Sequence, residues 1–301
     1  MYEVVASIAR ELGAAVEFCA PMSKYTSFKA GGNASLLVTP KEISSIPEII
    51  AACKDEGLPY FILGNGSNVL VTDGGIDGVV IRLGADVSNI TLLDDTTLLC
   101  EAGASLKSIC MFALEHSLTG LEFAYGIPGS LGGAVYMNAG AYGGEMKDVL
   151  YSVNHIDLEG KIGELSKDEL NLSYRHSAYS DNGFTITSAV IKLKKGNFEE
   201  IKAKMNELLG RRKEKQPIEF PSAGSTFKRP EGYFAGALIE SSGLKGKQIG
   251  GAQVSEKHAG FVINKNKATA TDIINLIKFI QDTVFENYGV HLETEVKIIG
   301  K

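Results

Sequence analysis

The turn at residues 62–75, ILGNGSNVLVTDGG, limits the folds open to this 301-residue chain. It runs from an apolar strand into Gly64, Gly66 and small polar residues, so it could present successive backbone N–H groups to a phosphate. Val69 replaces the third glycine of a dinucleotide-binding GxGxxG turn, and the Val-Leu-Val that begins there favours a strand where a Rossmann fold needs a helix. A Rossmann domain is therefore disfavoured. Spacing alone leaves a tight structural turn and an anion-binding turn both open.

A second glycine cluster, GIPGSLGGAVYMNAGAYGGE, occupies residues 126–145. Pro128 fixes one turn, and Gly132 and Gly133 remove side chains where something must approach the main chain closely. Two glycine-rich segments in one domain fit a large, planar, pyrophosphate-linked cofactor better than a mononucleotide. Tight packing of the protein against itself is the equal alternative.

Apolar runs along the chain predict an α+β pattern without strict βαβ alternation. We expect a short amphipathic helix at the N-terminus, a helix at 105–120 that ends in a glycine, and a polar helix that ends near a proline at 217. Ile273, Ile277, Ile280 and Val284 predict a longer helix that Gly289 stops. The remaining expectations are strands at 34–40, 59–63, 69–72, 78–83, 184–196 and 260–264, and hairpins at 90–100 and 153–165.

Composition and charge exclude several functions. The net charge is −6 and the basic residues are scattered, which argues against a nucleic-acid surface. The one local basic run, RRKEK at 211–215, is interpreted as a solvated helix end. The N-terminus does not resemble a signal peptide and no apolar run approaches a membrane span, so we expect a cytoplasmic protein with no membrane partner. We expect a monomer, although the sequence itself does not give the oligomeric state. The four cysteines and five histidines are dispersed, which predicts no metal site.

Three further motifs carry polar groups. PSAGSTFKRP (221–230) places hydroxyls beside Lys228 and Arg229 between two prolines, and is either a capped turn or an anionic-substrate loop. SYRHSAYS (173–180) holds Arg175, a carboxylate clamp or a surface arginine. In LETEVKIIG (292–300), strand alternation puts Glu293, Glu295 and Lys297 on one solvated face. No Walker A or GxSxG motif supports a kinase or a hydrolase.

Taken together, these segments resemble the UDP-N-acetylenolpyruvoylglucosamine reductase family. The matching pieces occur in the family's order from about residue 25 to the end: YTSFKAGG, LGNGSNVLV, GIPGSLGGAVYMNAGAYGGE, YRHS, PSAGSTFKRP, LIESSGLKGKQIGGAQVSEKHAGFVIN and LETEVKIIG. The resemblance implies an FAD-binding domain of the vanillyl-alcohol oxidase type and a smaller α+β substrate-binding domain. We place the FAD-binding region at 1–196, with lobes of about 1–70 and 71–196. The substrate-binding domain is placed at 197–301, with the join near 195–218 and the last strand packing back on the FAD region.

The resemblance also implies roles for individual residues. NADPH would reduce FAD, which would pass hydride to the enolpyruvyl group of UDP-N-acetylglucosamine enolpyruvate. Ser225 matches the family's proton donor, Arg175 its carboxylate-binding arginine, and Glu295 its second catalytic acid, acting in protonated form. The implied FAD contacts are Gly64, Asn65, Gly66, Ser67, Asn68, Gly126, Ile127, Pro128, Gly129, Ser130, Gly133, Asn138, Ala139 and Gly140. The implied substrate contacts are Lys228, Arg229, Gln253 and His258, the last two in a segment that lines the same cleft.

Two departures from the family pattern limit this transfer. The chain lacks the tyrosine-bearing loop that some members insert after the arginine motif, so it resembles the shorter subgroup and its lid is not identified. Arg229 stands where other members often have asparagine, so its contact is expected to go to the substrate diphosphate. The alternatives are an FAD-linked oxidase with the same cofactor domain and a nucleotide-sugar binding protein that has lost catalysis.

Overall fold

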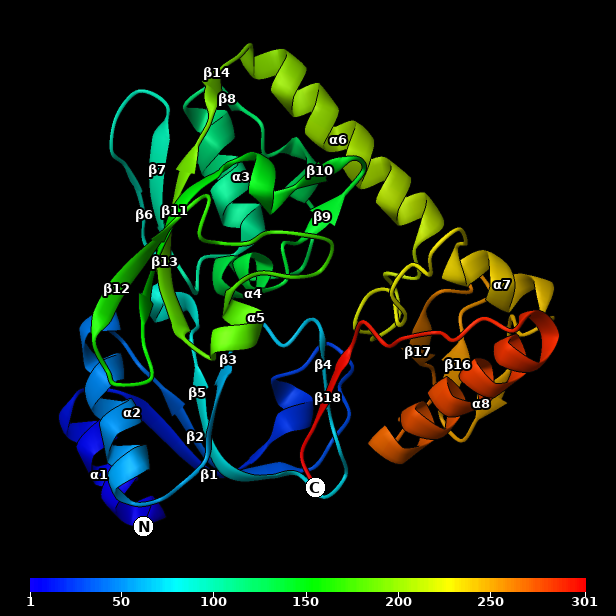
Figure 1. The fold of residues 1–301 in the computed structure, drawn as a ribbon, viewed down its shortest axis with the longest axis horizontal. Coiled ribbons are helices and arrows are strands. Elements are labelled where there is room, and N and C mark those ends of the chain that lie inside the picture. The colour runs from blue at the N-terminus through cyan, green and yellow to red at the C-terminus, as the bar shows by residue number, and fades with distance from the viewer. The chain divides into compact units, whose positions relative to one another are not determined.

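The computed structural model describes residues 1–301 and divides into two compact units (Figure 1). The first unit comprises residues 1–17, 36–65 and 78–212, and the second comprises residues 18–35, 66–77 and 213–301. Each unit buries a hydrophobic core of its own. The functional division at residue 196 stays a prediction. None of the helices combines the length and apolar character that a membrane crossing requires.

A five-stranded antiparallel sheet forms the centre of the first unit, in the order β12-β11-β13-β7-β6. Both predicted hairpins are confirmed, because β6 pairs with β7 and β11 pairs with β12. Helix α4 (Leu131–Tyr136) packs on β13 and β7. The strands are β6 (Ile90–Leu92), β7 (Thr97–Glu101), β11 (Leu150–Ile156), β12 (Ile162–Ser166) and β13 (Thr185–Lys192).

The N-terminal part of the chain contributes a four-stranded sheet in the order β1-β2-β5-β3, with β3 parallel to β5. Its strands are β1 (Ala15–Pro21), β2 (Asn33–Thr39), β3 (Tyr60–Leu63) and β5 (Ile76–Arg82). Helices α1 (Tyr2–Glu11) and α2 (Ile46–Asp55) pack against each other. The predicted N-terminal helix and the strands expected at 34–40, 59–63 and 78–83 are therefore confirmed.

Shorter elements complete the first unit. Its remaining helices are α3 (Leu106–Glu115), α5 (Tyr179–Asn182) and most of α6 (Phe198–Lys215), which continues past the end of this unit at residue 212. Two further strand pairs are β8 (Leu118–Thr119) with β14 (Lys194–Lys195) and β9 (Gly140–Ala141) with β10 (Gly144–Glu145). The expectation that the helix at 105–120 ends in a glycine was wrong. It stops at Glu115, where Ser117 takes a left-handed φ of 55° and the chain enters β8. Single-turn 3-10 helices lie at Met22–Lys24, Ile43–Ser45, Ala85–Val87, Glu122–Ala124 and Met146–Asp148.

The second unit packs α8 (Ala270–Tyr288) on a three-stranded sheet of β15 (Gln248–Ile249), β16 (Ala252–Val254) and β17 (Val262–Asn264), with α7 (Ala235–Ser241) beside it (Figure 1). Thr269 and Asp272 form a capping box at the start of α8, and Gly289 ends it with φ 67°. The predicted long helix is thus confirmed with both of its ends. Strand β18 (Lys297–Ile299) pairs in parallel with β4 (Val69–Val71).

The segment 292–300 differs from the predicted strand. Only Lys297–Ile299 forms a strand, and Glu295 and Val296 are both buried, so the expected alternation fails. Two hydrogen bonds from other segments set this conformation. The N–H of Glu295 donates to the carbonyl of Thr226 at 2.8 Å, and the Glu295 carbonyl accepts from Asn68 at 3.1 Å. The prediction of a solvated face for Glu295 was therefore wrong, because pairing with distant segments overrides local alternation.

Candidate active site

The two glycines of the 64–68 turn lie close to other parts of the protein. A Cβ added to Gly66 would lie 2.2 Å from the carbonyl oxygen of Tyr25, and Gly66 has a left-handed φ of 60°. A Cβ on Gly64 would lie 2.2 Å from the hydroxyl of Ser130. The backbone contact and the positive φ explain Gly66 without a ligand, whereas at Gly64 the close atom belongs to a side chain that can rotate. Both positions leave the N–H groups of a tight turn in place.

Two asparagines of this turn tie it to other segments. Asn65 donates from Nδ2 to the carbonyl of Pro128 at 3.4 Å. Asn68 donates to the carbonyl of Glu295, and its own carbonyl accepts from the N–H of Lys297 at 3.0 Å. The partly buried Ser67 lies between them. In the second unit, Asn68 therefore helps to hold the main chain at the predicted catalytic acid Glu295.

The glycine-rich segment 126–145 contains a short helix, α4, that the sequence did not predict. Ser130 is its N-cap residue, and the Ser130 hydroxyl is buried with no hydrogen-bond partner. Leaving a buried hydroxyl unsatisfied costs about 1–3 kcal/mol. Gly133, one turn further on, is exposed, and a Cβ there would meet only that hydroxyl, at 3.7 Å.

An unsatisfied hydroxyl beside bare main chain fits an oxygen-rich ligand such as the pyrophosphate of FAD. Gly64 and Gly133 flank it. The neighbouring predicted FAD contacts belong to the same segment, in which the Gly129 carbonyl accepts from Leu106 at 3.0 Å. They are Gly126, Ile127, Pro128, Gly129, Ala139 and Gly140. The residues present therefore suit this cofactor.

Arg175 stands at the tip of a two-residue turn. The N–H of Ser173 donates to the carbonyl of His176 and the N–H of His176 donates back to the carbonyl of Ser173, both at 3.2 Å. Arg175 takes a left-handed φ of 56°, which is uncommon for a residue with a long side chain. Its guanidinium lies 5.0 Å from the ring centroid of the half-exposed Tyr174. Such backbone strain is typical of functional turns.

The segments that hold Ser225 and Glu295 pair with each other within the second unit. Thr226 pairs with Glu295 through the 2.8 Å hydrogen bond described above, and Phe227 forms a bridge with Thr294. The Thr226 hydroxyl is fully buried and accepts from Val262 at 2.9 Å, which anchors this loop to β17. Ser225 therefore precedes the residue that pairs with Glu295, and Glu295 is only 9% exposed. Arg175 belongs to the first unit.

The two predicted cations of this loop have protein partners. Lys228 forms an ion pair with Glu293, Nζ to Oε2 at 3.0 Å, while the N–H of Lys228 donates to the Glu293 carbonyl. Arg229 places its guanidinium 4.0 Å from the ring centroid of Phe234, whose side chain is 62% exposed. Exposed ion pairs contribute little to stability, so both cations can reorient toward an anion at small cost.

Gln253 and His258 are held by the second unit's sheet and turns. Gln253 lies in β16 and donates to the carbonyl of Gly246 at 3.2 Å. His258 Nδ1 accepts from the N–H of Gly260 at 3.1 Å, and burial lowers the pKa of its imidazole. His258 is therefore neutral at pH 7, with its proton on Nε2 as a donor.

Arg212 is a residue that the sequence interpretation missed. The sequence predicts a solvated helix end at 211–215, but burial lowers the pKa of the Arg212 guanidinium, which lies 5.7 Å from the ring centroid of Tyr142. A Cβ on Gly126 would lie 3.4 Å from Arg212 Cδ. The available signal was helical spacing, because Met205 and Leu208 are buried on the preceding turns. Arg212 thus brings a positive charge to the glycine-rich segment.

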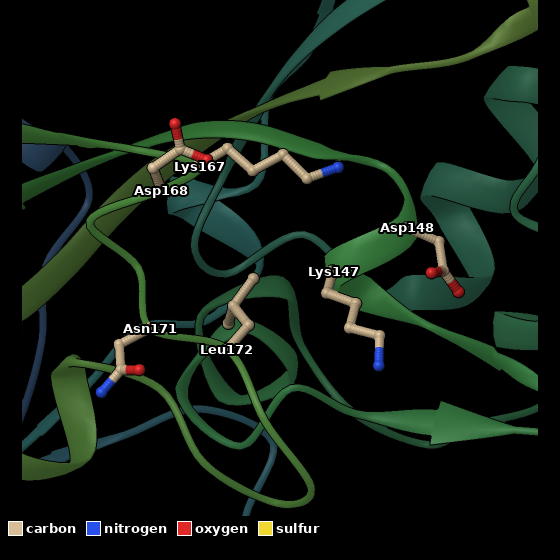
Figure 2. Close-up of a pocket in the computed structure, with 6 residues that line it drawn as sticks. All are labelled: Lys147, Asp148, Lys167, Asp168, Asn171 and Leu172. Atoms are coloured by element: carbon tan, nitrogen blue, oxygen red, sulfur yellow. The ribbon is translucent and has the colours of Figure 1, made fainter.

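A cavity of about 550 Å³ opens elsewhere on the first unit (Figure 2). None of its lining residues was predicted as a site residue. The lysines and aspartates that line the cavity balance in charge, so its lining shows no preference for an anion or a cation. The lining residues are Lys147, Asp148, Lys167, Asp168, Asn171 and Leu172.

Comparisons with known proteins first define the class. Residues 34–166 match the model of an FAD binding domain. The fold is shared with the BBE-like 1 protein of Physcomitrella patens, at a TM-score of 0.50 and 14% identity, over 64% of this chain and 44% of that chain. The chain therefore contains an FAD-binding domain.

Closer relatives identify the family. Residues 216–299 match the C-terminal domain of UDP-N-acetylenolpyruvoylglucosamine reductase. The reductase of that name from Clostridium novyi is 54% identical over 93% of this chain and 91% of its own length. The crystal structure of the corresponding reductase from Thermus caldophilus superposes with a TM-score of 0.82 at 34% identity, covering 95% of this chain and 99% of that chain.

The chain belongs to the UDP-N-acetylenolpyruvoylglucosamine reductase family. It is thus an FAD-dependent oxidoreductase, and the cofactors of this family are FAD and NADPH. The α+β fold, the enzyme class and the cofactors expected from the sequence are confirmed. The alternative of an FAD-linked oxidase has only a shared fold in its favour, with a Phl p 4 variant described as a glucose oxidase, at a TM-score of 0.50 and 13% identity over 65% of this chain and 44% of that chain.

Proposed function

We propose that the protein reduces UDP-N-acetylglucosamine enolpyruvate to UDP-N-acetylmuramate with NADPH, as a step in the synthesis of peptidoglycan precursors. FAD, when bound, supplies hydride transfer from NADPH to the terminal carbon of the enolpyruvyl group. The observation that carries the proposal is the main-chain pairing of Thr226, the residue after Ser225, with the buried Glu295, which brings the two segments that hold these residues side by side. A proton donor and a carboxylic acid are the two groups that this reduction needs from the second unit.

Ser225 is proposed as the proton donor. Hydride addition at the terminal carbon leaves an electron pair on the carbon next to the carboxylate, and a proton must be added there. A serine is ordinarily a weak acid, but this carbon is strongly basic, so a hydroxyl held within hydrogen-bond reach can protonate it. The anchoring of Thr226 to Val262 keeps the neighbouring Ser225 in a fixed position.

Arg175 and Glu295 are proposed to stabilise the charge that develops before this proton arrives. The guanidinium of Arg175 presents paired N–H donors that suit the substrate carboxylate. Glu295, acting in protonated form, would add a hydrogen bond to the same enediolate-like group. Hydrogen bonds that strengthen as negative charge grows lower the barrier more than they favour the ground state.

Further residues are proposed to hold the cofactor and the sugar nucleotide. The main chain of the 64–68 turn and of the 126–140 segment, with the Ser130 hydroxyl, would bind FAD; the unsatisfied state of that hydroxyl supports this assignment. Lys228 and Arg229 would contact the substrate diphosphate, and the Nε2–H of His258 would act as a neutral donor in the same region, near Gln253.

Ser225→Ala tests the mechanism by separating its two half-reactions. We expect reduction by NADPH to proceed normally, while reoxidation by the enolpyruvyl substrate slows by about 10²–10⁴-fold, the usual loss when a general acid is removed. Ser222→Ala is the matched control, since it makes the same change in the same loop and should leave both half-reactions intact. Both are measured anaerobically by stopped-flow absorbance.

Two outcomes would contradict the proposal. Equal slowing of both half-reactions by Ser225→Ala would show that Ser225 has a structural role. Tight binding of the enolpyruvyl substrate by the wild-type protein without any turnover would instead favour the nucleotide-sugar binding protein considered above.

A further inference from the structure

Asn138 is completely buried in the glycine-rich segment, between α4 and β9. Its side-chain amide makes three hydrogen bonds within the protein. Nδ2 donates to Oε2 of Glu145 at 2.7 Å and to the carbonyl of Ser173 at 2.9 Å, and Oδ1 accepts from the N–H of Lys147 at 2.9 Å. The side chain of Asn138 therefore has no N–H left to donate to FAD, because both Nδ2 hydrogens are used within the protein.

The carbonyl that Asn138 binds is the one that closes the Arg175 turn. The Ser173 carbonyl accepts both from the N–H of His176, across the turn, and from Asn138, 35 positions earlier in the chain. A carbonyl oxygen has two lone pairs, so both hydrogen bonds can form together. One side chain thus connects the glycine-rich segment to the base of the turn that presents Arg175.

A second hydrogen bond runs between the same two segments. The fully buried Ser177 donates from Oγ to the carbonyl of Tyr136, the last residue of α4, at 2.7 Å. Ser173 and Ser177 flank the Arg175 turn on either side, so the turn is attached at both ends. The cavity in Figure 2 is lined by the loops next to these attachments, with Lys147 on one side and Asn171 on the other.

We propose that Asn138, together with Ser177, is a positioning residue that fixes the Arg175 turn on the glycine-rich segment in the conformation that binds the substrate carboxylate. The inference rests on the proposed role of Arg175. Arg175 holds a left-handed φ of 56°, a conformation that is costly for this residue and persists only when its surroundings impose it. The hydrogen bonds from Asn138 to the Ser173 carbonyl and from Ser177 to the Tyr136 carbonyl supply this constraint, while the bonds to Glu145 and Lys147 hold the Asn138 side chain in place.

The choice of asparagine has a backbone reason as well. Asn138 itself takes a left-handed φ of 43°, which asparagine tolerates better than most residues. The substitution Asn138→Gly therefore removes the three side-chain hydrogen bonds without adding backbone strain. Asn171→Gly is a matched control, since Asn171 is exposed and has a φ of 45° in the neighbouring loop.

The test is a double-mutant cycle between Asn138→Gly and Arg175→Ala, measured on the holoenzyme. On the wild-type background, we expect Asn138→Gly to slow reoxidation by the enolpyruvyl substrate and to weaken substrate binding, with a combined loss of about tenfold. On the Arg175→Ala background, we expect Asn138→Gly to have less than a twofold effect, which is within the scatter seen for independent sites. Reduction by NADPH and the behaviour of Asn171→Gly should match the wild type. A purely structural role would give equal losses on both backgrounds and would overturn the proposal.

Ser177→Ala provides an independent variant should Asn138→Gly fail to fold. It leaves the Asn138 amide intact, and it is expected to slow the substrate half-reaction on the wild-type background and to have no effect on the Arg175→Ala background. Full substrate reactivity of Ser177→Ala would overturn the inference. Normal reoxidation in Arg175→Ala alone would instead refute the proposed role of Arg175, so the two failures are distinguishable.

Discussion

Gly66 stands in the turn between β3 and β4, and an alanine there would collide with the main chain of an earlier segment. The added Cβ would lie 2.2 Å from the Tyr25 carbonyl oxygen and 3.0 Å from Thr26 Cα. Both contacts are with backbone, so no side-chain rotation can relieve them. The N–H of Ser27 also donates to the Gly66 carbonyl at 3.0 Å, which limits any movement of the turn.

The size of the effect follows from comparison with Gly243. This glycine has a φ of 70°, similar to the 60° of Gly66 and in the same unit, but nothing lies within 4 Å of a Cβ built on it. Gly243→Ala should therefore cost only the left-handed backbone penalty, about 1–2 kcal/mol. Gly66→Ala carries the same penalty plus about 2–3 kcal/mol for displacing packed main chain, so we expect about 3–5 kcal/mol in total.

Urea unfolding of the two variants beside the wild type checks this difference. The free energy of unfolding of the second unit should fall by at least twice as much for Gly66→Ala as for Gly243→Ala. Equal losses in the two variants would refute the argument that close packing against Tyr25 requires the glycine. A ligand would then remain the better explanation for Gly66.

Three further predictions concern thiols, pH and a helix end. The exposed Cys19 should be the one thiol that reacts with Ellman's reagent in the native protein, and all four should react in urea, because the other three are buried. Burial lowers the pKa of His258 and of His155 below 6.5, so the unfolded chain binds protons more readily. The free energy of unfolding should thus fall as pH drops below about 6.5, and less steeply in His258→Gln. Asp73→Ala should cost about 1–2 kcal/mol in urea unfolding, because Asp73 accepts from the first N–H groups of α8, at 2.8 Å each.

Much of the fold could be predicted from local sequence patterns. The α8 helix carries its own start and stop signals in Thr269, Asp272 and Gly289, and the hairpins carry turn residues between apolar strands. Helix α4 could not be predicted in this way. Its sequence, LGGAVY, contains two glycines in six residues, so it forms through packing on β13 and not through helix propensity.

The residues of the candidate site could be predicted from the sequence only where they belong to a recognisable motif. Arg175, Ser225 and Glu295 were chosen by resemblance, whereas the burial of Glu295 depends on hydrogen bonds to Thr226 and Asn68 that no local pattern encodes. The link from Asn138 to Ser173 has the same origin, since it joins positions far apart in the sequence. Non-local hydrogen bonds thus decide which polar residues of a glycine-rich loop contact the protein itself.

The most direct test of the proposed function is anaerobic mixing of the NADPH-reduced holoenzyme with UDP-N-acetylglucosamine enolpyruvate. The proposal predicts that the yellow absorbance of oxidised flavin returns, with one UDP-N-acetylmuramate formed for each flavin reoxidised. Failure of the absorbance to return with this substrate, in a preparation that NADPH reduces normally, would contradict it.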